Sequence, residues 1–124
     1  MKKVINTDKA PKAIGPYSQA IEANGMLFIS GQIPVNPATG NLAEGITDQT
    51  RQVMENISAI LAEAGYTFEN VVKCTCLLDN MDNFKPFNEV YGQYFTSEPP
   101  ARAAFAVVKL PLGVMVEIET IAVK

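Results

Sequence analysis

Two segments with helical periodicity, each followed by an apolar strand, limit this chain to a β-sheet that carries helices on one face. In residues 47–64, apolar side chains recur every three or four positions, and Gly65 is a typical stop signal for a helix. A second apolar stripe covers residues 84–95, with Pro86 in its first turn, where the missing N–H does no harm. Right-handed crossover connections then place both helices on the same face of one sheet.

Short apolar segments predict the strands of that sheet. We expect them at about residues 2–6, 17–23, 26–32, 71–78, 99–108 and 114–121. Asn24-Gly25 is a strong hairpin signal, because both central residues of a type I′ turn need positive φ. The order of elements predicts an α/β fold of the α+β type, with a mixed sheet in one domain over residues 1–124. The second sheet face is also apolar and has no helix left to cover it, so we expect another copy of the chain to cover it.

The composition is that of an ordinary globular domain, with 124 residues, 48% hydrophobic side chains and 19% charged ones. A net charge of −3 argues against a nucleic-acid-binding surface. The apolar stretches are far shorter than a membrane span, and no apolar core follows Lys2 and Lys3 as it would in a signal peptide. We therefore expect a cytoplasmic protein that binds neither nucleic acid nor a membrane.

The chain has no histidine, which removes Ser–His and Cys–His nucleophilic pairs and the commonest metal ligand. Any proton transfer near neutral pH must then use a carboxylate, Lys, Tyr or a backbone-held water. Cys74 and Cys76 lie two positions apart in an expected strand, so both thiols point to one face. Because no third or fourth sulfur or nitrogen ligand is present, we interpret them as core residues and expect no zinc site.

Arg102 is the only charge in the apolar run from Pro99 to Val108, and a guanidinium is costly to desolvate there without an anionic partner. Glu117 lies in the last apolar strand, which we expect to be adjacent to the strand of Arg102. The two residues predict a small site that binds an anion and handles a proton. The alternative is a structural Arg–Glu pair that ties two strands together. We expect the side chain of Glu119 to face away from that of Glu117.

Four segments, taken together and in this order, resemble the RidA/YjgF family of enamine and imine deaminases. They are residues 13–20 (AIGPYSQA), 30–34 (SGQIP), 100–104 (PARAA) and 116–119 (VEIE). The resemblance implies a chorismate-mutase-like fold and a homotrimer with a site in each cleft between subunits. It also implies hydrolysis of 2-imino acids, such as 2-iminobutanoate and 2-iminopropanoate, to 2-oxo acids and ammonia, with no cofactor in the deaminase.

The same resemblance implies the roles of individual residues. Arg102 aligns with the arginine that binds the substrate carboxylate, and Glu117 aligns with the acid that positions the attacking water. The implied substrate-binding residues are Tyr17, Ser30, Gly31, Asn88 and Ala104. Gly31 has no Cβ and can bring its backbone N–H close to a ligand. Ala104 would offer its backbone carbonyl to the imine nitrogen; many relatives have Cys there, so this chain excludes any role for a thiol at that position.

Two functions other than the deaminase are open from the sequence. A non-catalytic binder or regulator that recognises 2-oxo acids needs nearly the same anion-binding group. Cleavage of single-stranded RNA, described for some relatives, fits less well. An acidic chain without histidine offers neither a phosphate-binding surface nor the usual acid–base residue.

Overall fold

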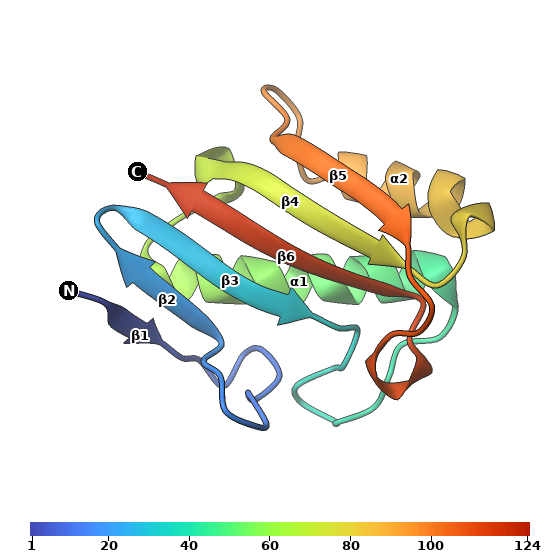
Figure 1. The fold of residues 1–124 in the computed structure, drawn as a ribbon, viewed down its shortest axis with the longest axis horizontal. Helices are drawn as coiled ribbons and strands as arrows, with labels where there is room; N and C mark the ends of the chain where they lie inside the picture. The colour runs from blue at the N-terminus through green and yellow to red at the C-terminus, as the bar shows by residue number, and fades with distance from the viewer.

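Six strands form one mixed sheet in the computed structural model, which describes residues 1–124, and two helices cover one face of that sheet (Figure 1). The strands are β1 (Lys3–Ile5), β2 (Ala20–Ala23), β3 (Met26–Gln32), β4 (Val71–Leu78), β5 (Ala101–Ala106) and β6 (Val116–Val123). The helices are α1 (Gly45–Ala64) and α2 (Phe84–Gly92). The predicted fold class is confirmed.

The strand order in the sheet is β1-β2-β3-β6-β4-β5, so the last strand of the chain lies in the interior of the sheet. β6 pairs antiparallel with β3 on one side and with β4 on the other. β4 and β5 form the one parallel pair, which α2 connects, and β5 is an edge strand. α1 connects β3 to β4 across β6 on the same face (Figure 1).

The predicted ranges of β3 and β4 agree with the structure, and the Asn24-Gly25 hairpin is confirmed by φ values of 52° and 74°. α1 ends as predicted before Gly65, whose φ of 83° is left-handed. β2 is shorter than predicted: the Gln19 carbonyl still accepts a hydrogen bond from Ser30 of β3, but regular strand pairing begins only at Ala20. α2 ends at Gly92 instead of residue 95.

The hydrophobic core lies between the helices and the sheet. Its fully buried side chains include Leu27, Ile57, Ile60, Leu61, Leu78, Phe87 and Ile118. Cys74 and Cys76 are also buried, unpaired and on the same face of β4, as predicted. Packing against both helices therefore fixes which face of β4 points inward.

The opposite face of the sheet carries no helix and is called the open face here (Figure 1). Large apolar side chains are exposed on it from β1 at one end to β5 at the other. They include Val4, Phe28, Phe105 and Val123. The prediction of an uncovered apolar face is confirmed. No helix of the structure combines the length and the apolar character needed to cross a bilayer.

Replacing both cysteines by alanine removes two buried sulfur atoms, so we expect the free energy of unfolding to fall by about 1–3 kcal/mol. Urea denaturation followed by circular dichroism measures this loss. Val108→Ala is the matched control, since the Val108 side chain is fully exposed and its truncation should change the free energy by less than about 0.5 kcal/mol. A double cysteine variant that does not fold would contradict a packing role of this size.

Candidate active site

Arg102 lies on the edge strand β5 and points toward α2. Its register partner is the buried Cys74, so the guanidinium emerges on the helix-covered side of the sheet. Nη1 of Arg102 donates a hydrogen bond of 2.6 Å to Oδ1 of Asn88, which is exposed on α2. Cζ of Arg102 lies 5.4 Å from the ring centroid of Phe84 and 5.0 Å from that of Tyr91. The remaining guanidinium N–H groups point to no acceptor within the chain.

Ala104 follows on the same side of β5 and is partly buried against the core. Its register partner is Cys76, and burial raises the pKa of the Cys76 thiol to about 12. Burial also raises the pKa of Cys74, although the nearby hydroxyls of Tyr91 and Thr120 and the charge of Arg102 oppose the change. Both thiols are therefore protonated at neutral pH, and neither is a ready nucleophile. We group Arg102, Asn88 and Ala104 as the Arg102 group.

Glu117 lies on β6 against Gly31 of β3. Ile118 and Val116, its chain neighbours, are buried under the helices, so Glu117 points to the open face. The register between β3 and β6 shifts between Ile29 and Gln32, where Gly31 lies. A Cβ atom at Gly31 would collide with the Glu117 carboxylate. A larger residue at Gly31 would therefore displace the Glu117 carboxylate from this position.

Ser30 connects β3 to the segment that carries Tyr17. Its Oγ donates a hydrogen bond of 2.6 Å to the Ser18 carbonyl, and its backbone N–H donates one of 2.9 Å to the Gln19 carbonyl. The Ser30 hydroxyl is thus engaged with the backbone and holds this segment in place. Tyr17 itself is about half exposed and, with Gly31, lines a groove of about 750 Å³. We group Tyr17, Ser30, Gly31 and Glu117 as the Glu117 group.

Gln19 organises the loop before Tyr17 and was not singled out from the sequence. It is buried, and its Oε1 accepts a hydrogen bond of 2.8 Å from the Thr7 backbone N–H. Its Nε2 donates to the carbonyls of Thr7, Ala10 and Pro11 at 3.0, 3.3 and 2.8 Å. The signal that could have identified it was its place in the AIGPYSQA segment, as a long polar residue directly before an apolar strand.

Two predictions about the position of Glu117 are wrong, and the first concerns its neighbour Glu119. Glu119 does not face away from Glu117: residues two apart in a strand share a face, and both side chains lie on the open face. Burial raises the pKa of Glu117 above its ordinary value, and the charge of Glu119 raises it further. The folded chain therefore holds the Glu117 proton more tightly than an exposed carboxyl would, chiefly because of burial.

The strands of Arg102 and Glu117 are also not adjacent, because β4 lies between β5 and β6. The two side chains point to opposite sides of the sheet, and no ion pair joins them, so a structural Arg–Glu pair is excluded as well. Within one chain, the seven predicted site residues therefore form two separate groups. Each group is chemically incomplete, since one holds a cation and the other holds a carboxylate without a partner.

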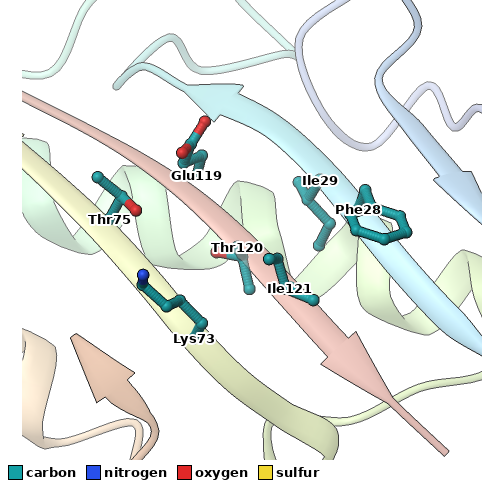
Figure 2. A pocket seen from close by; sticks show the side chains of 7 residues that line it. All are labelled: Phe28, Ile29, Lys73, Thr75, Glu119, Thr120 and Ile121. Atoms are coloured by element: carbon teal, nitrogen blue, oxygen red, sulfur yellow. The ribbon is translucent and has the colours of Figure 1, made fainter. Parts of the chain in front are cut away.

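A shallow depression of about 210 Å³ on the open face contains none of the predicted site residues. Figure 2 shows Thr75 of β4 next to Glu119 of β6, and Lys73 of β4 across β6 from Phe28 of β3. No three acidic or cysteine side chains converge closely enough to hold a metal ion. The depression thus has one acid and one base but no set of metal ligands.

Comparison with known proteins places this chain in a family. A family model described as Endoribonuclease L-PSP matches residues 7–124. The chain belongs to the RidA/YjgF family. Several archaeal and bacterial relatives are named RutC family proteins. A mouse relative named 2-iminobutanoate/2-iminopropanoate deaminase is 48% identical over 125 residues, which cover 100% of this chain and 93% of the mouse protein.

Solved structures agree with this assignment. The crystal structure of RidA from an Antarctic Psychrobacter species superposes with a TM-score of 0.96 at 43% identity, over 98% of this chain and 99% of that one. The crystal structure of E. coli TdcF with bound serine has a TM-score of 0.95 at 42% identity, over 98% of each chain. The fold of this family member is therefore the fold of the Rid proteins.

The raised pKa of Glu117 leads to a prediction about stability. The folded chain holds this proton more tightly than the unfolded chain, so the free energy of unfolding falls as pH rises through the two pKa values. At pH 7 the ionised carboxylate is therefore destabilising, and Glu117→Gln should raise the free energy of unfolding. Below about pH 3.5 the carboxyl is protonated in both states, and the difference should vanish.

Urea denaturation at these two pH values measures the effect. Glu119→Gln is the companion variant: it removes the neighbouring charge, which is the smaller cause, and should stabilise the chain less than Glu117→Gln does. A Glu117→Gln variant that is less stable than the wild type at pH 7 would show that the carboxylate is held by favourable contacts instead.

Proposed function

We propose that this protein hydrolyses 2-imino acids to 2-oxo acids and ammonia at a site built from two copies of the chain. The observation that carries the proposal is the complementarity of the two incomplete groups. Arg102 is held by Asn88 with its other N–H donors unused, and Glu117 is a half-buried carboxylate with no cation near it. A 2-imino acid needs one group of each kind, because it carries a carboxylate beside an electrophilic carbon.

The proposed chemistry follows from these groups. The planar guanidinium of Arg102 binds the substrate carboxylate through paired N–H donors, which fixes the orientation of the imine carbon. The backbone carbonyl of Ala104 accepts a hydrogen bond from the imine nitrogen. Glu117 accepts a proton from a water molecule as the water adds to the imine carbon, and returns it to the nitrogen to give a carbinolamine. Glu117 then takes the hydroxyl proton of the carbinolamine and delivers it to the nitrogen as the C–N bond breaks, which releases the 2-oxo acid and ammonia. The raised pKa of Glu117 brings its proton affinity closer to that needed at neutral pH.

Relatives support this class of substrate. Relatives from mouse and cattle are named for the deamination of 2-iminobutanoate and 2-iminopropanoate. The TdcF structure contains serine, which like a 2-imino acid has a carboxylate beside a carbon that bears nitrogen. The family description names an endoribonuclease, but a net charge of −3 and the lack of histidine favour a small anion over RNA.

The proposal includes a homotrimer with sites between subunits. The open face exposes the apolar side chains of Val4, Phe28, Phe105 and Val123. Exposure of such a surface to water is unfavourable, and another protein surface can cover it. A second copy that covers this face can bring its own Arg102 group to the edge near the Glu117 group. This arrangement accounts for seven site residues that a single chain holds on opposite sides of its sheet.

Variants of the two charged residues should differ in what they lose. Arg102→Lys keeps the charge but removes the planar donors, so binding of a 2-oxo acid should weaken and turnover should fall with it. Glu117→Gln keeps the shape and removes the base, so 2-oxo acid binding should remain while turnover falls by about 10²–10⁴-fold. Calorimetric titration with 2-oxobutanoate and ammonia release from enzymatically generated 2-iminobutanoate measure the two effects.

Normal turnover by Glu117→Gln would mean that Glu117 has only a structural role. Normal binding of the 2-oxo acid by Arg102→Lys would mean that another residue binds the ligand carboxylate. Wild-type protein that binds the 2-oxo acid but releases no ammonia would favour the metabolite-binding alternative. The double variant of Cys74 and Cys76 is the control, because both thiols lie outside the proposed chemistry and its folded fraction should turn over imine.

Mixing two inactive variants tests the shared site directly. If Arg102 and Glu117 act from different copies, each trimer that contains both Arg102→Lys and Glu117→Gln subunits regains one intact site. Random mixing from denaturant should restore about one quarter of wild-type activity, because one interface in four then joins an intact Arg102 group to an intact Glu117 group. Sedimentation equilibrium should give three times the 13.4 kDa of one chain. No recovery in assembled trimers, or a monomer, would contradict the shared site.

A further inference from the structure

Three side chains of α2 meet the guanidinium of Arg102 from one stripe of the helix. Phe84, Asn88 and Tyr91 are four and then three residues apart, so they lie one above another on the same helix face. Asn88 supplies the hydrogen bond, and the two rings lie 5.4 and 5.0 Å from Cζ, within the range of a cation–π interaction. Three residues on one stripe of α2 therefore contact a single side chain of the neighbouring strand.

One hydrogen bond would not fix Arg102. The residue is exposed on an edge strand, and the bond from Nη1 to Asn88 leaves the guanidinium free to turn about that contact. Arginine side chains have about 2 kcal/mol of rotamer entropy to lose when they are ordered. Paired binding of a carboxylate requires the plane and the edge of the guanidinium to be set in advance.

We propose that Phe84 and Tyr91 are positioning residues that hold the plane of the Arg102 guanidinium, so that the edge not bonded to Asn88 is presented to a carboxylate. This inference rests on the proposed function of Arg102 and adds two residues to it. The rings act through Arg102 and do not themselves need to touch the substrate.

The hydroxyl of Tyr91 supports a role for its ring. Tyr91 is buried and its Oη atom has no hydrogen-bond partner, although it lies beside the Cys74 thiol. Burial raises the pKa of Tyr91, so the phenol remains neutral beneath the cation. A buried hydroxyl without a partner contributes nothing favourable. The part of Tyr91 that interacts favourably is its aromatic face.

The rings are themselves fixed by other aromatic side chains. Phe87 lies between them on α2, with centroid distances of 6.2 Å to Phe84 and 5.5 Å to Tyr91, and Phe95 lies 4.9 Å from Tyr91. Such pairs restrict ring orientation through edge and offset contacts. Val90 is also buried on α2 but belongs to none of these pairs, so it offers a matched control for loss of packing on this helix.

The chain has only two arginines, Arg51 and Arg102, which makes the positioning measurable by NMR. In protein labelled with ¹⁵N-arginine, Arg102→Lys identifies the Arg102 Nε–H signal by its disappearance. We expect this signal to be sharp in the wild type and in Tyr91→Phe, which keeps the ring. In Tyr91→Leu and Phe84→Leu it should broaden or vanish through motion and exchange with water.

Val90→Ala should lower the free energy of unfolding while the Arg102 signal stays sharp. Circular dichroism confirms that each variant is folded before its spectrum is compared. A sharp Arg102 signal in folded Tyr91→Leu and Phe84→Leu would overturn the proposal, because the guanidinium would then be ordered without the rings.

Ligand binding supplies a second measurement. Tyr91→Leu should raise the dissociation constant for 2-oxobutanoate by about tenfold, within the range of cation–π effects, and Tyr91→Phe should restore most of the binding. In the Arg102→Lys background the Tyr91→Leu effect should be much smaller, since no planar cation remains to be oriented. Equal effects in the two backgrounds would mean that Tyr91 acts independently of Arg102 and would overturn the proposal.

The two proposals fail in different ways. If 2-oxobutanoate binding depends on the rings but no variant or wild-type protein releases ammonia from 2-iminobutanoate, the positioning role stands and the deaminase proposal falls. If ammonia is released normally while ring loss changes neither the Arg102 signal nor binding, the positioning role falls and the deaminase proposal stands.

Discussion

The position of β6 between β3 and β4 is the constraint on which the rest of the structure depends. β6 comes last in the chain, yet it provides the antiparallel partner for both neighbours. Pairing with β3 brings Glu117 against Gly31, and pairing with β4 places Ile118 over the core. Both pairings join segments far apart in sequence, so the Glu117 group cannot form until the C-terminal strand is in place.

Buried amide side chains hold the loops around the 750 Å³ groove, where sheet pairing ends. Asn56 of α1 donates hydrogen bonds to the carbonyls of Ile33 and Val35, and Gln49 joins Ala43 to the Met115 backbone. Gln19 does the same for the loop that precedes Tyr17. Backbone groups in these loops are therefore satisfied by side chains from rigid elements, and such hydrogen bonds are costly to lose when buried. The shape of the groove therefore depends on buried amide side chains that hold its loops, and Gln19 also lines it.

The sequence predicted the elements well because each has a local physical cause. Helical periodicity located α1, and the Asn24-Gly25 turn located the hairpin. What failed was the placement of side chains across distant elements. The insertion of β6 between β3 and β4 depends on long-range pairing, so adjacency of Arg102 and Glu117 could not be read from order along the chain. The prediction for Glu119 was wrong for a different reason. Side chains two residues apart in a strand lie on the same face, so the sequence alone places Glu119 beside Glu117.

The Arg102 group and the Glu117 group are held by different elements of the fold. α2 and the edge strand β5 order a cation, while β3 and β6 hold a carboxylate whose pKa is raised by partial burial. Neither group neutralises the other, because β4 separates them and their side chains leave the sheet on opposite sides. An ion pair within the chain would have occupied the donors of Arg102 and lowered the pKa of Glu117, removing both properties that anion binding and proton transfer require. Keeping the two charges apart within one copy therefore leaves both free to act in the site that we propose between two copies.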